Sequence, residues 1–209
     1  MKAPNAIRIL SVDDHELIHE GIATVTGNQP DMQLVACASS GREAIERYRQ
    51  YRPDIVLMDL RLPDLSGIDA IMAIRTEFTD ARIIILATFG GDVEVQRALK
   101  AGARGYFLKS LPPAELVAAI REVYLGNIRV QPELVEQVAE HIGEDRLSDR
   151  EIEILECVAA GQHNREIGRR LSISEETVKA HLRHIIVKLG AKNRTHALAI
   201  ANQRGLLRI

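Results

Sequence analysis

The first 125 residues alternate between short apolar runs and amphipathic stretches. The runs are rich in aliphatic and β-branched residues, which favour strands. They are Ile7–Val12, Gln33–Ala38, Asp54–Met58, Arg82–Ala87 and Gly105–Leu108. Runs without a polar interruption, such as IVLM and RIIIL, are typical of strands buried on both faces. The stretches with helical spacing are Glu16–Thr26, Gly41–Tyr51, Ile68–Phe78, Asp92–Ala101 and Pro113–Leu125.

The alternation ends at Leu125, and helical patterns follow. We expect a linker over residues 126–145, with a short helix from Pro132 to Ile142. The sequence therefore predicts an α/β domain over residues 1–125, with a flavodoxin-like five-stranded parallel sheet in the order 2-1-3-4-5. An all-α, four-helix domain over residues 146–209 follows it. Its predicted helices are Ser148–Ala160, Asn164–Leu171, Glu175–Leu189 and Arg194–Arg204.

Cap signals mark the ends of these later helices. Ser148 is followed three residues on by Glu151, which is the spacing of a capping box. Asn164 and Ser174 are expected to cap the next two helices, and Gly190 to end the third. The boundaries of the four helices are therefore well defined by local chemistry.

A turn of three residues, Ser172 to Ser174, separates the second and third of these helices. That spacing suits a helix-turn-helix, whose second helix enters the major groove of DNA. The apolar stripe of this helix consists of Val178, Leu182, Ile185, Ile186 and Leu189. The polar and cationic residues off the stripe are Thr177, Lys179, His181, Arg183, His184 and Lys188. Charge pattern alone favours a solvated helix, and the caps and the tight turn shift the interpretation to a DNA-reading helix.

Acidic residues and one lysine follow three of the predicted strands. Asp13 and Asp14 come after the first strand, Asp59 after the third and Lys109 after the fifth. Because the carboxyl ends of parallel strands share one edge, these side chains are expected to meet there. Three carboxylates suit Mg²⁺, and one of them can act as a nucleophile toward a phosphoryl group. The alternative for Asp13 and Asp14 is that they cap the next helix.

Charge is divided unevenly along the chain. Residues 146–209 hold 12 lysines and arginines against 7 acidic residues, a net charge of +5, whereas residues 1–145 hold 15 against 22, a net charge of −7. A basic second part indicates a polyanionic partner, although a merely solvated surface explains the split equally well. With no Trp and 3% aromatic residues, the chain lacks stacking platforms for single-stranded nucleic acid.

Cys37 and Cys157 are too few and too isolated for a disulfide framework or a zinc site. We interpret them as small core residues in a reducing compartment. The N-terminus has no apolar signal region, and no apolar run reaches the ~18 residues of a membrane span. A soluble, cytoplasmic protein without a membrane partner is therefore expected.

The second domain resembles the LuxR-type helix-turn-helix over its whole length. The matching elements are LSDREIEIL, AAGQHNREI, LSISEETVKAHL, IIVKLGAKNRTHA and the ending GLL. The resemblance implies a DNA-binding domain that docks as a dimer on double-stranded promoter DNA. The residues implied in or near the DNA contact are Asn164, Thr177, Val178, Lys179, His181, Arg183, Lys188 and Arg194. His163 departs from the family pattern, which usually has a small residue, Thr or Ser before the Asn.

The first domain resembles response-regulator receiver domains over about residues 6–125. The matching elements are VDDHELIHEGI, PDIVLMDLRLPDLSGIDA, ALKAGARGYFLK and PAELVAAI. The resemblance implies that Asp59 accepts a phosphoryl group and that Lys109 pairs with its oxygens. It implies a Mg²⁺ site made by Asp14, Asp59 and a backbone carbonyl near Arg61, with Asp13 supporting it through water. Tyr106 is the implied aromatic whose rotamer reports activation.

One position departs from the receiver pattern. An ungapped count places Ala87 where receivers carry a switch Ser or Thr, with Thr88 beside it. Ala cannot bond a phosphoryl group, so either the coupling is weaker or Thr88 replaces it. Ser110 also stands where many receivers have Pro after the Lys.

The two domains together resemble the NarL/FixJ class of bacterial regulators. The combination implies a transcriptional regulator, not an enzyme, that receives its phosphoryl group from a sensor histidine kinase. Membership of this class also implies that the chain promotes its own dephosphorylation, and phosphorylation is expected to favour a homodimer. Two alternative functions have less support in the sequence. A phosphatase or hydrolase with an Asp nucleophile would need a cap domain, for which no insertion is long enough. A receiver that only binds proteins would leave the basic helical domain unexplained.

Overall fold

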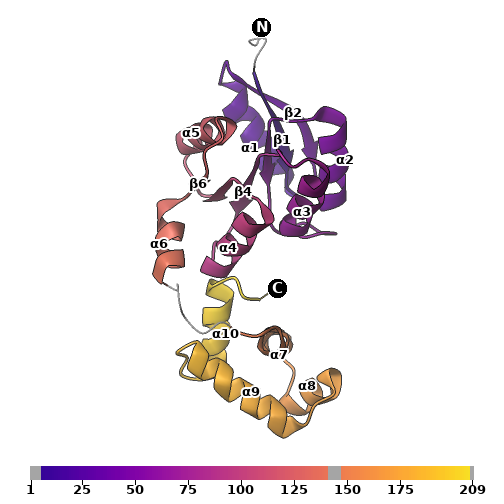
Figure 1. Cartoon of the computed structure of the whole chain (residues 1–209), viewed down its shortest axis with the longest axis vertical. Helices are drawn as coiled ribbons and strands as arrows, with labels where there is room; N and C mark the ends of the chain where they lie inside the picture. Colours follow the sequence, from indigo (N-terminus) through magenta and orange to yellow (C-terminus); the bar gives the residue numbers. More distant parts are fainter. Residues whose placement is uncertain (1–5, 141–146, 208–209) are drawn as a thin grey trace. The chain divides into compact units, whose positions relative to one another are not determined.

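The computed structural model describes residues 6–140 and 147–207 of the 209-residue chain. They form two compact units, one built around a parallel sheet and one built from the helices near the C-terminus (Figure 1). The predicted end of the linker helix at Ile142 and the predicted boundary at residues 145–146 lie outside the described residues. None of the described helices is both long enough and apolar enough to span a membrane.

The sheet consists of six parallel strands in the order β2-β1-β3-β4-β5-β6. The strands are β1 (Ile7–Val12), β2 (Met32–Ala38), β3 (Ile55–Met58), β4 (Ile83–Ala87), β5 (Gly105–Leu108) and β6 (Arg129–Val130). The first five correspond to the five apolar runs and pair in the predicted order. The predicted α/β fold is therefore confirmed.

The sixth strand differs from the prediction of five. Arg129 and Val130 of β6 pair with Gly105 and Tyr106 of β5, and the N–H of Gln131 donates to the Tyr106 carbonyl at 3.1 Å. A two-residue strand has no apolar alternation that a sequence pattern can reveal. The segment assigned to the linker therefore begins with a strand of the sheet.

Helices cover both faces of the sheet. They are α1 (Glu16–Gly27), α2 (Gly41–Tyr51), α3 (Gly67–Glu77), α4 (Asp92–Ala101) and α5 (Pro113–Tyr124), with α6 (Pro132–Glu140) following β6. In the right-handed crossovers of a parallel sheet, α2, α3 and α4 cover one face, and α1 and α5 cover the other.

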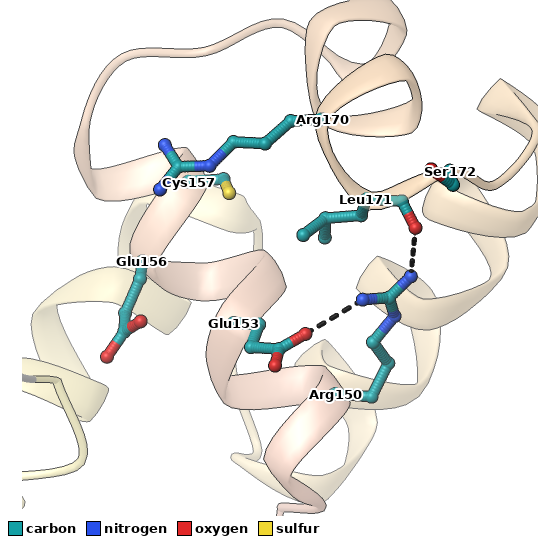
Figure 2. Close-up of a pocket in the computed structure, with 7 residues that line it drawn as sticks. All are labelled: Arg150, Glu153, Glu156, Cys157, Arg170, Leu171 and Ser172. Carbon is teal, nitrogen blue, oxygen red and sulfur yellow. Dashed lines mark hydrogen bonds and ion pairs between the residues drawn. The ribbon is translucent and has the colours of Figure 1, made fainter.

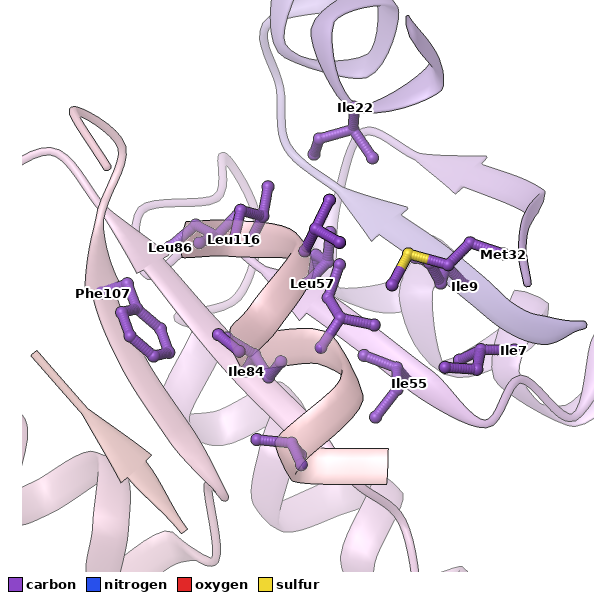
Figure 3. Close-up of a cluster of buried hydrophobic side chains, with 14 residues drawn as sticks. Ile7, Ile9, Ile22, Met32, Ile55, Leu57, Ile84, Leu86, Phe107 and Leu116 are labelled. Carbon is purple, nitrogen blue, oxygen red and sulfur yellow. The ribbon is translucent and has the colours of Figure 1, made fainter. Parts of the chain in front are cut away.

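The core between the sheet and helices α1 and α5 is made of aliphatic side chains (Figure 3). Ile9, Ile55, Leu57 and Ile84 of the strands belong to one cluster with Ile22 of α1 and Leu116 of α5, and these four strand residues are 0% exposed. Burial of such side chains stabilises the fold by about 1.5–3 kcal/mol each. The strand ends that carry Asp13, Asp59 and Lys109 are thus fixed by a dry core.

The C-terminal unit is formed by α7 (Asp149–Ala159), α8 (Asn164–Leu171), α9 (Glu175–Lys188) and α10 (Arg194–Gln203). Its core includes Ile154 and Leu155 of α7, Ile167 of α8 and Ile185 of α9, all fully buried. The four predicted helices and the three-residue turn between α8 and α9 are confirmed.

The caps agree with the sequence at two of three helix starts. Ser148 and Glu151 form the predicted capping box, and Ser174 accepts the N–H of Thr177 at 3.0 Å. The prediction that Asn164 caps α8 is wrong. Asn164 is the first residue of the helix, and His163 is the cap residue, with its N–H bonded to Glu166 Oε2 at 2.7 Å.

Both cysteines are free in this fold. Cys37 is partly buried on β2, and Cys157 is buried on α7. Burial raises the pKa of the Cys37 thiol, and the nearby Glu43 carboxylate adds to the effect. Both residues thus act as packing residues in the folded chain.

Candidate functional site

The carboxyl edge of the sheet gathers the residues that the sequence singled out. Asp13 follows β1, Asp59 follows β3, and Lys109 follows β5. The Asp59 N–H donates to the carbonyl of Val12 at 2.9 Å, and the Lys109 N–H donates to that of Ala87 at 2.7 Å. Continued strand pairing therefore carries the three side chains to one place, as the parallel-sheet argument predicts.

Lys109 joins the two buried carboxylates of this edge. Its Nζ lies 2.7 Å from Asp13 Oδ2 and 3.0 Å from Asp59 Oδ2. Burial acts to lower the pKa of Lys109, but its bonds to Asp13 and Asp59 outweigh burial and raise that pKa. The ammonium therefore stays charged between the two carboxylates.

Asp59 is only 4% exposed, and both of its oxygens have a partner. Oδ1 accepts the N–H of Leu60 at 2.8 Å, while Oδ2 faces Lys109. Burial raises the pKa of Asp59; the Lys109 ammonium partly opposes this, and the Asp13 carboxylate adds to it. The carboxylate is thus desolvated but held in position, which suits a nucleophile.

The loop after Asp59 brings α3 close to it. Gly67, the first residue of α3, donates its N–H to the Leu60 carbonyl at 2.8 Å, and a Cβ built on Gly67 would lie 2.1 Å from the Asp59 carbonyl oxygen. No larger residue fits there, so Gly67 allows the helix to pack against the strand end. Asp64 in the same loop accepts the N–H groups of Gly41 and Arg42 at the start of α2, so its carboxylate joins the loop to that helix.

Asp13, Asp14 and His15 form a group that can hold a metal ion. His15 Nδ1 lies 3.0 Å from Asp13 Oδ1 and 2.8 Å from Asp14 Oδ1. Carboxylate oxygens are the donors that a hard divalent cation prefers. His15 stands in the VDDHE motif but was not among the residues predicted for this site. His15, not an aspartate, occupies the cap position of α1 and makes no side-chain cap bond, so the helix-cap alternative for the aspartates is wrong.

The residues around the switch position lie at the end of β4 and on β5. Ala87 is buried, and Thr88 is exposed. Tyr106 is fully buried, and its hydroxyl lies 3.4 Å from the carbonyl of Phe89. Arg61, whose carbonyl was predicted near the metal, is exposed at the same edge, two residues after Asp59.

The predicted DNA-contacting residues of α9 differ in their exposure. Thr177, Lys179 and Arg183 are exposed, and His181 is partly buried. Val178 is 0% exposed in the core of the domain, so the prediction that it touches the groove is wrong. Ala180, next to Lys179 on the same helix, is partly exposed.

Two other predicted DNA contacts are bonded within the domain. Lys188 Nζ lies 2.8 Å from Oε2 of the buried Glu151, and Arg194 donates to the carbonyl of Gln162 at 3.3 Å. Asn164 is partly buried at the start of α8. Lys188 thus has a compensated charge, whereas the ion pairs of Lys179 within the described residues are with the exposed Glu175 and Glu176 of its own helix.

Comparison with known proteins places both units. The family model of the response regulator receiver domain matches residues 9–121, and that of the bacterial regulatory proteins of the luxR family matches residues 145–201. Response regulator protein VraR of Staphylococcus epidermidis is 34% identical over 207 residues, which cover 97% of this chain and 99% of that protein. VraR of Staphylococcus aureus is 34% identical over 206 residues, or 96% and 99% of the two chains.

Solved structures agree with this assignment. The response regulator ChrA of a heme-sensing two-component system is 33% identical, with a TM-score of 0.58 over 97% of this chain and 100% of that one. A LuxR-family response regulator from Aurantimonas sp. is 40% identical, with a TM-score of 0.63 over 65% and 97%. The response regulator RcsB in complex with DNA is 25% identical, with a TM-score of 0.70 over 95% and 99%.

The fold, the edge site and the helical domain define a two-component regulator of transcription under phosphorylation control. The chain belongs to the response regulators that join a receiver domain to a LuxR-family helix-turn-helix domain. The resemblance stated from the sequence motifs is therefore confirmed.

Proposed function

We propose that Asp59 accepts the phosphoryl group that controls this regulator. The observation that carries the proposal is the buried Asp59 carboxylate at a strand end, bridged by Lys109 to Asp13. A carboxylate oxygen of Asp59 attacks the phosphorus of a phosphohistidine in a sensor kinase. The P–N bond breaks, its electron pair returns to the imidazole, and the acyl phosphate forms on Asp59. The chain is the acceptor in this step and not an enzyme acting on a separate substrate.

Mg²⁺ is the cofactor proposed for the step. Asp13, Asp14 and Asp59, with the carbonyl of Arg61, would hold it, because their oxygens are hard donors at one edge of the sheet. When bound, the ion neutralises charge on the transferring group. Lys109 stays protonated and pairs with a phosphoryl oxygen, which replaces part of its present bond to Asp59.

The response to phosphorylation is proposed to pass through β4 and β5. Tyr106 is the aromatic whose rotamer follows the state of the site. Ala87 offers no hydroxyl to the phosphoryl group, so Lys109 carries more of the response, with Thr88 as the alternative hydroxyl. We also place the end of the receiver domain after β6, near Gln131, instead of at residue 125, because β6 pairs with β5.

Promoter DNA is the proposed partner of the helical domain. The exposed face of α9, with Thr177, Lys179 and Arg183, enters the major groove, and Asn164 and Arg194 lie toward the backbone. His181 belongs to the same face. RcsB, which shares this architecture, has been solved with DNA. Lys188 is assigned to the domain's interior, because Glu151 holds it.

One helix-turn-helix module buries only about 600–1,000 Å² on DNA, so tight binding calls for two modules on paired half-sites. We propose that phosphorylation favours this homodimer. A regulator that acts on promoters in this manner works in the bacterial cytoplasm.

The test of the phosphoryl site is intact-mass measurement of the full chain. Incubation with acetyl phosphate and Mg²⁺ is expected to add one phosphoryl group, and Asp59→Asn is expected to prevent the addition. Asp69→Asn is the matched control, because Asp69 is an exposed carboxylate that bonds Ser66 at the start of α3. A phosphoryl group that still adds to Asp59→Asn, or that adds equally without Mg²⁺, would overturn the assignment.

A further inference from the structure

The first turn of α7 contacts the C-terminal ends of both helices of the helix-turn-helix. Arg150 lies on this turn and reaches across to α8. Its Nη2 donates to the carbonyl of Leu171, the last residue of α8, while Nη1 bonds Glu153 Oε2 at 2.8 Å (Figure 2). The last carbonyls of a helix have no partner within it, so Arg150 supplies one from another element.

The chain turns sharply where Arg150 holds it. Ser172 adopts a left-handed conformation, with φ of 56°, and Ile173 donates its N–H back to the Gly168 carbonyl at 2.9 Å. A Cβ on Gly168 would lie 2.8 Å from the Ile173 carbonyl oxygen. The turn between α8 and α9 is thus closely packed at Gly168 on one side and bonded to Arg150 at Leu171.

Glu151, the next residue, contacts the other helix. Its carboxylate is 4% exposed and accepts the N–H of Ser148 at 2.8 Å and the Nζ of Lys188 at 2.8 Å. Lys188 is the last residue of α9. Consecutive residues of α7 therefore bond the C-terminal end of α8 and the C-terminal end of α9.

We propose that Arg150 and Glu151 are positioning residues that set the orientation of the DNA-reading helix. The inference rests on the proposed DNA binding by α9. The reading residues Thr177 to Arg183 are the third to the ninth residues of the 14-residue α9, and the first of them lie far from the end that Glu151 holds. Thr177 is about 16 Å along the axis from Lys188, so a tilt of about 10° at that end moves it by about 3 Å.

Contacts to bases tolerate displacements of only about 0.5 Å, whereas phosphate contacts from long side chains are more forgiving. Apolar packing through Val178, Leu182 and Ile185 keeps α9 in the domain. Arg150 and Glu151 add directional bonds at its end and at the preceding turn. Loss of either should therefore reduce sequence discrimination more than overall attraction to DNA.

The cavity beside Arg150 supplies a matched control. It has a volume of about 380 Å³, and Arg170 of α8 lines it opposite Cys157 of α7 (Figure 2). Arg170 lines the same cavity and carries the same charge as Arg150, but it lies on α8 and not on α7. Arg170→Met thus removes a guanidinium without removing a bond between α7 and the helix ends.

The experiment measures how well the full chain discriminates between DNA sequences. A duplex is first enriched from a random-sequence pool by the wild-type chain. Affinity for this duplex and for the starting pool is then compared for Arg150→Met, Glu151→Gln and Arg170→Met over a range of salt. Gln at position 151 keeps an acceptor for Ser148 and removes only the charge facing Lys188. Arg150→Lys is the conservative rescue, and circular dichroism verifies folding.

The expected result is a loss of about tenfold or more for the enriched duplex in Arg150→Met and Glu151→Gln, the size of one well-made base contact. Affinity for the pool and the slope of affinity against salt stay unchanged, since no phosphate contact is lost. Arg150→Lys recovers part of the loss, and Arg170→Met shows none.

Two results would overturn the inference while leaving DNA binding intact. In the first, affinity for the duplex and for the pool falls equally with a flatter salt slope, which makes these residues direct phosphate contacts. In the second, folded Glu151→Gln and Arg150→Met discriminate as well as wild type. If the wild-type chain enriches no duplex, the proposed DNA binding itself fails, and the inference fails with it.

Discussion

Lys109 controls the charge balance of the carboxyl edge. It lies between two buried carboxylates and has only 14% of its side chain exposed. Without it, Asp13 and Asp59 would face each other without the ammonium that now lies between them. Its position at the end of β5 also links the site to Tyr106, which stands three residues earlier on the same strand.

Replacing Lys109 tests this balance. Lys109→Met is expected to slow phosphoryl transfer to Asp59. It is also expected to remove most of the increase in DNA affinity that phosphorylation of Asp59 produces. Each bond from an ammonium to a charged oxygen is worth about 1.5–3 kcal/mol, so the loss of coupling should exceed tenfold. The measurement is the rate of phosphorylation by acetyl phosphate. Lys100→Met, at an exposed lysine of α4, should match wild type; a full rate and full gain in Lys109→Met would contradict the role.

The switch position is a second test at this scale. Ala87→Thr is expected to strengthen the phosphorylation-dependent gain in DNA affinity by about tenfold, because a hydroxyl can then bond a charged phosphoryl oxygen. Thr88→Ala should have little effect, since Thr88 is exposed. The measurement is DNA affinity of each variant with and without acetyl phosphate. If Thr88→Ala alone removes the gain, Thr88 is the switch residue.

At the scale of helices and strands, the periodicity of apolar residues predicted the elements that are long enough to show a repeating pattern. It did not predict β6, which is too short to show one. β1, β3 and β4 appear as continuous apolar runs because both of their faces are buried, whereas β2, at one edge of the sheet, is only partly buried. β6 has only two residues and is held by backbone hydrogen bonds, which any pair of residues other than proline can form. The pattern of apolar side chains therefore does not predict it. Val178 lay on the predicted apolar stripe, and its burial follows from that stripe and not from the matched family position.

Some contacts of the functional residues were likewise predictable from the sequence, and others were not. The strand ends that bring Asp13, Asp59 and Lys109 together were predictable, since parallel topology alone aligns them. The bond between Lys188 and Glu151 was not, because it joins residues 37 positions apart on different helices. His15 was missed because a histidine that follows two aspartates is indistinguishable in sequence from an ordinary helix start.

The Glu151–Lys188 pair should make the helical domain sensitive to acid. Burial acts to raise the pKa of Glu151, but the bonds to Lys188 and Ser148 outweigh it and lower that pKa below its usual 4.5. A carboxyl whose pKa is lowered by folding stabilises the fold when the pH is above its pKa in the unfolded chain. This contribution is lost as the pH falls through its pKa in the folded chain. The pair's stability is therefore complete at neutral pH and disappears in acid.

Glu151→Gln measures this contribution. Breaking a fully buried pair costs about 3–5 kcal/mol, and the partial exposure of Lys188 reduces the expected loss to about 1–3 kcal/mol at pH 7. Free energies of unfolding for wild type and variant should converge as pH falls below 4.5, the ordinary pKa of this carboxyl, and through its lowered value in the folded chain. Urea denaturation across pH is the measurement. A difference that stays constant down to pH 3 would show that charge contributes nothing.

At the scale of the whole molecule, phosphorylation is proposed to shift the equilibrium between the single chain and the homodimer. It can favour a dimer only if the phosphorylated site is more stable in that state than in the single chain. Light scattering with and without acetyl phosphate and Mg²⁺ is expected to show a doubled mass at micromolar concentration. Asp59→Asn should remain at the single-chain mass throughout. An unchanged mass in the phosphorylated wild type would contradict the dimer.

The measurement that tests the central claim most directly is DNA affinity of the full chain as a function of phosphorylation at Asp59. The probe is the duplex enriched by the wild-type chain, with acetyl phosphate and Mg²⁺ present or absent. Wild type is expected to gain about five- to 150-fold in affinity, the range of ordinary coupling between two sites. Asp59→Asn should bind with the lower affinity in both conditions. A gain that survives in Asp59→Asn, or phosphorylated wild type without any gain, would contradict the account.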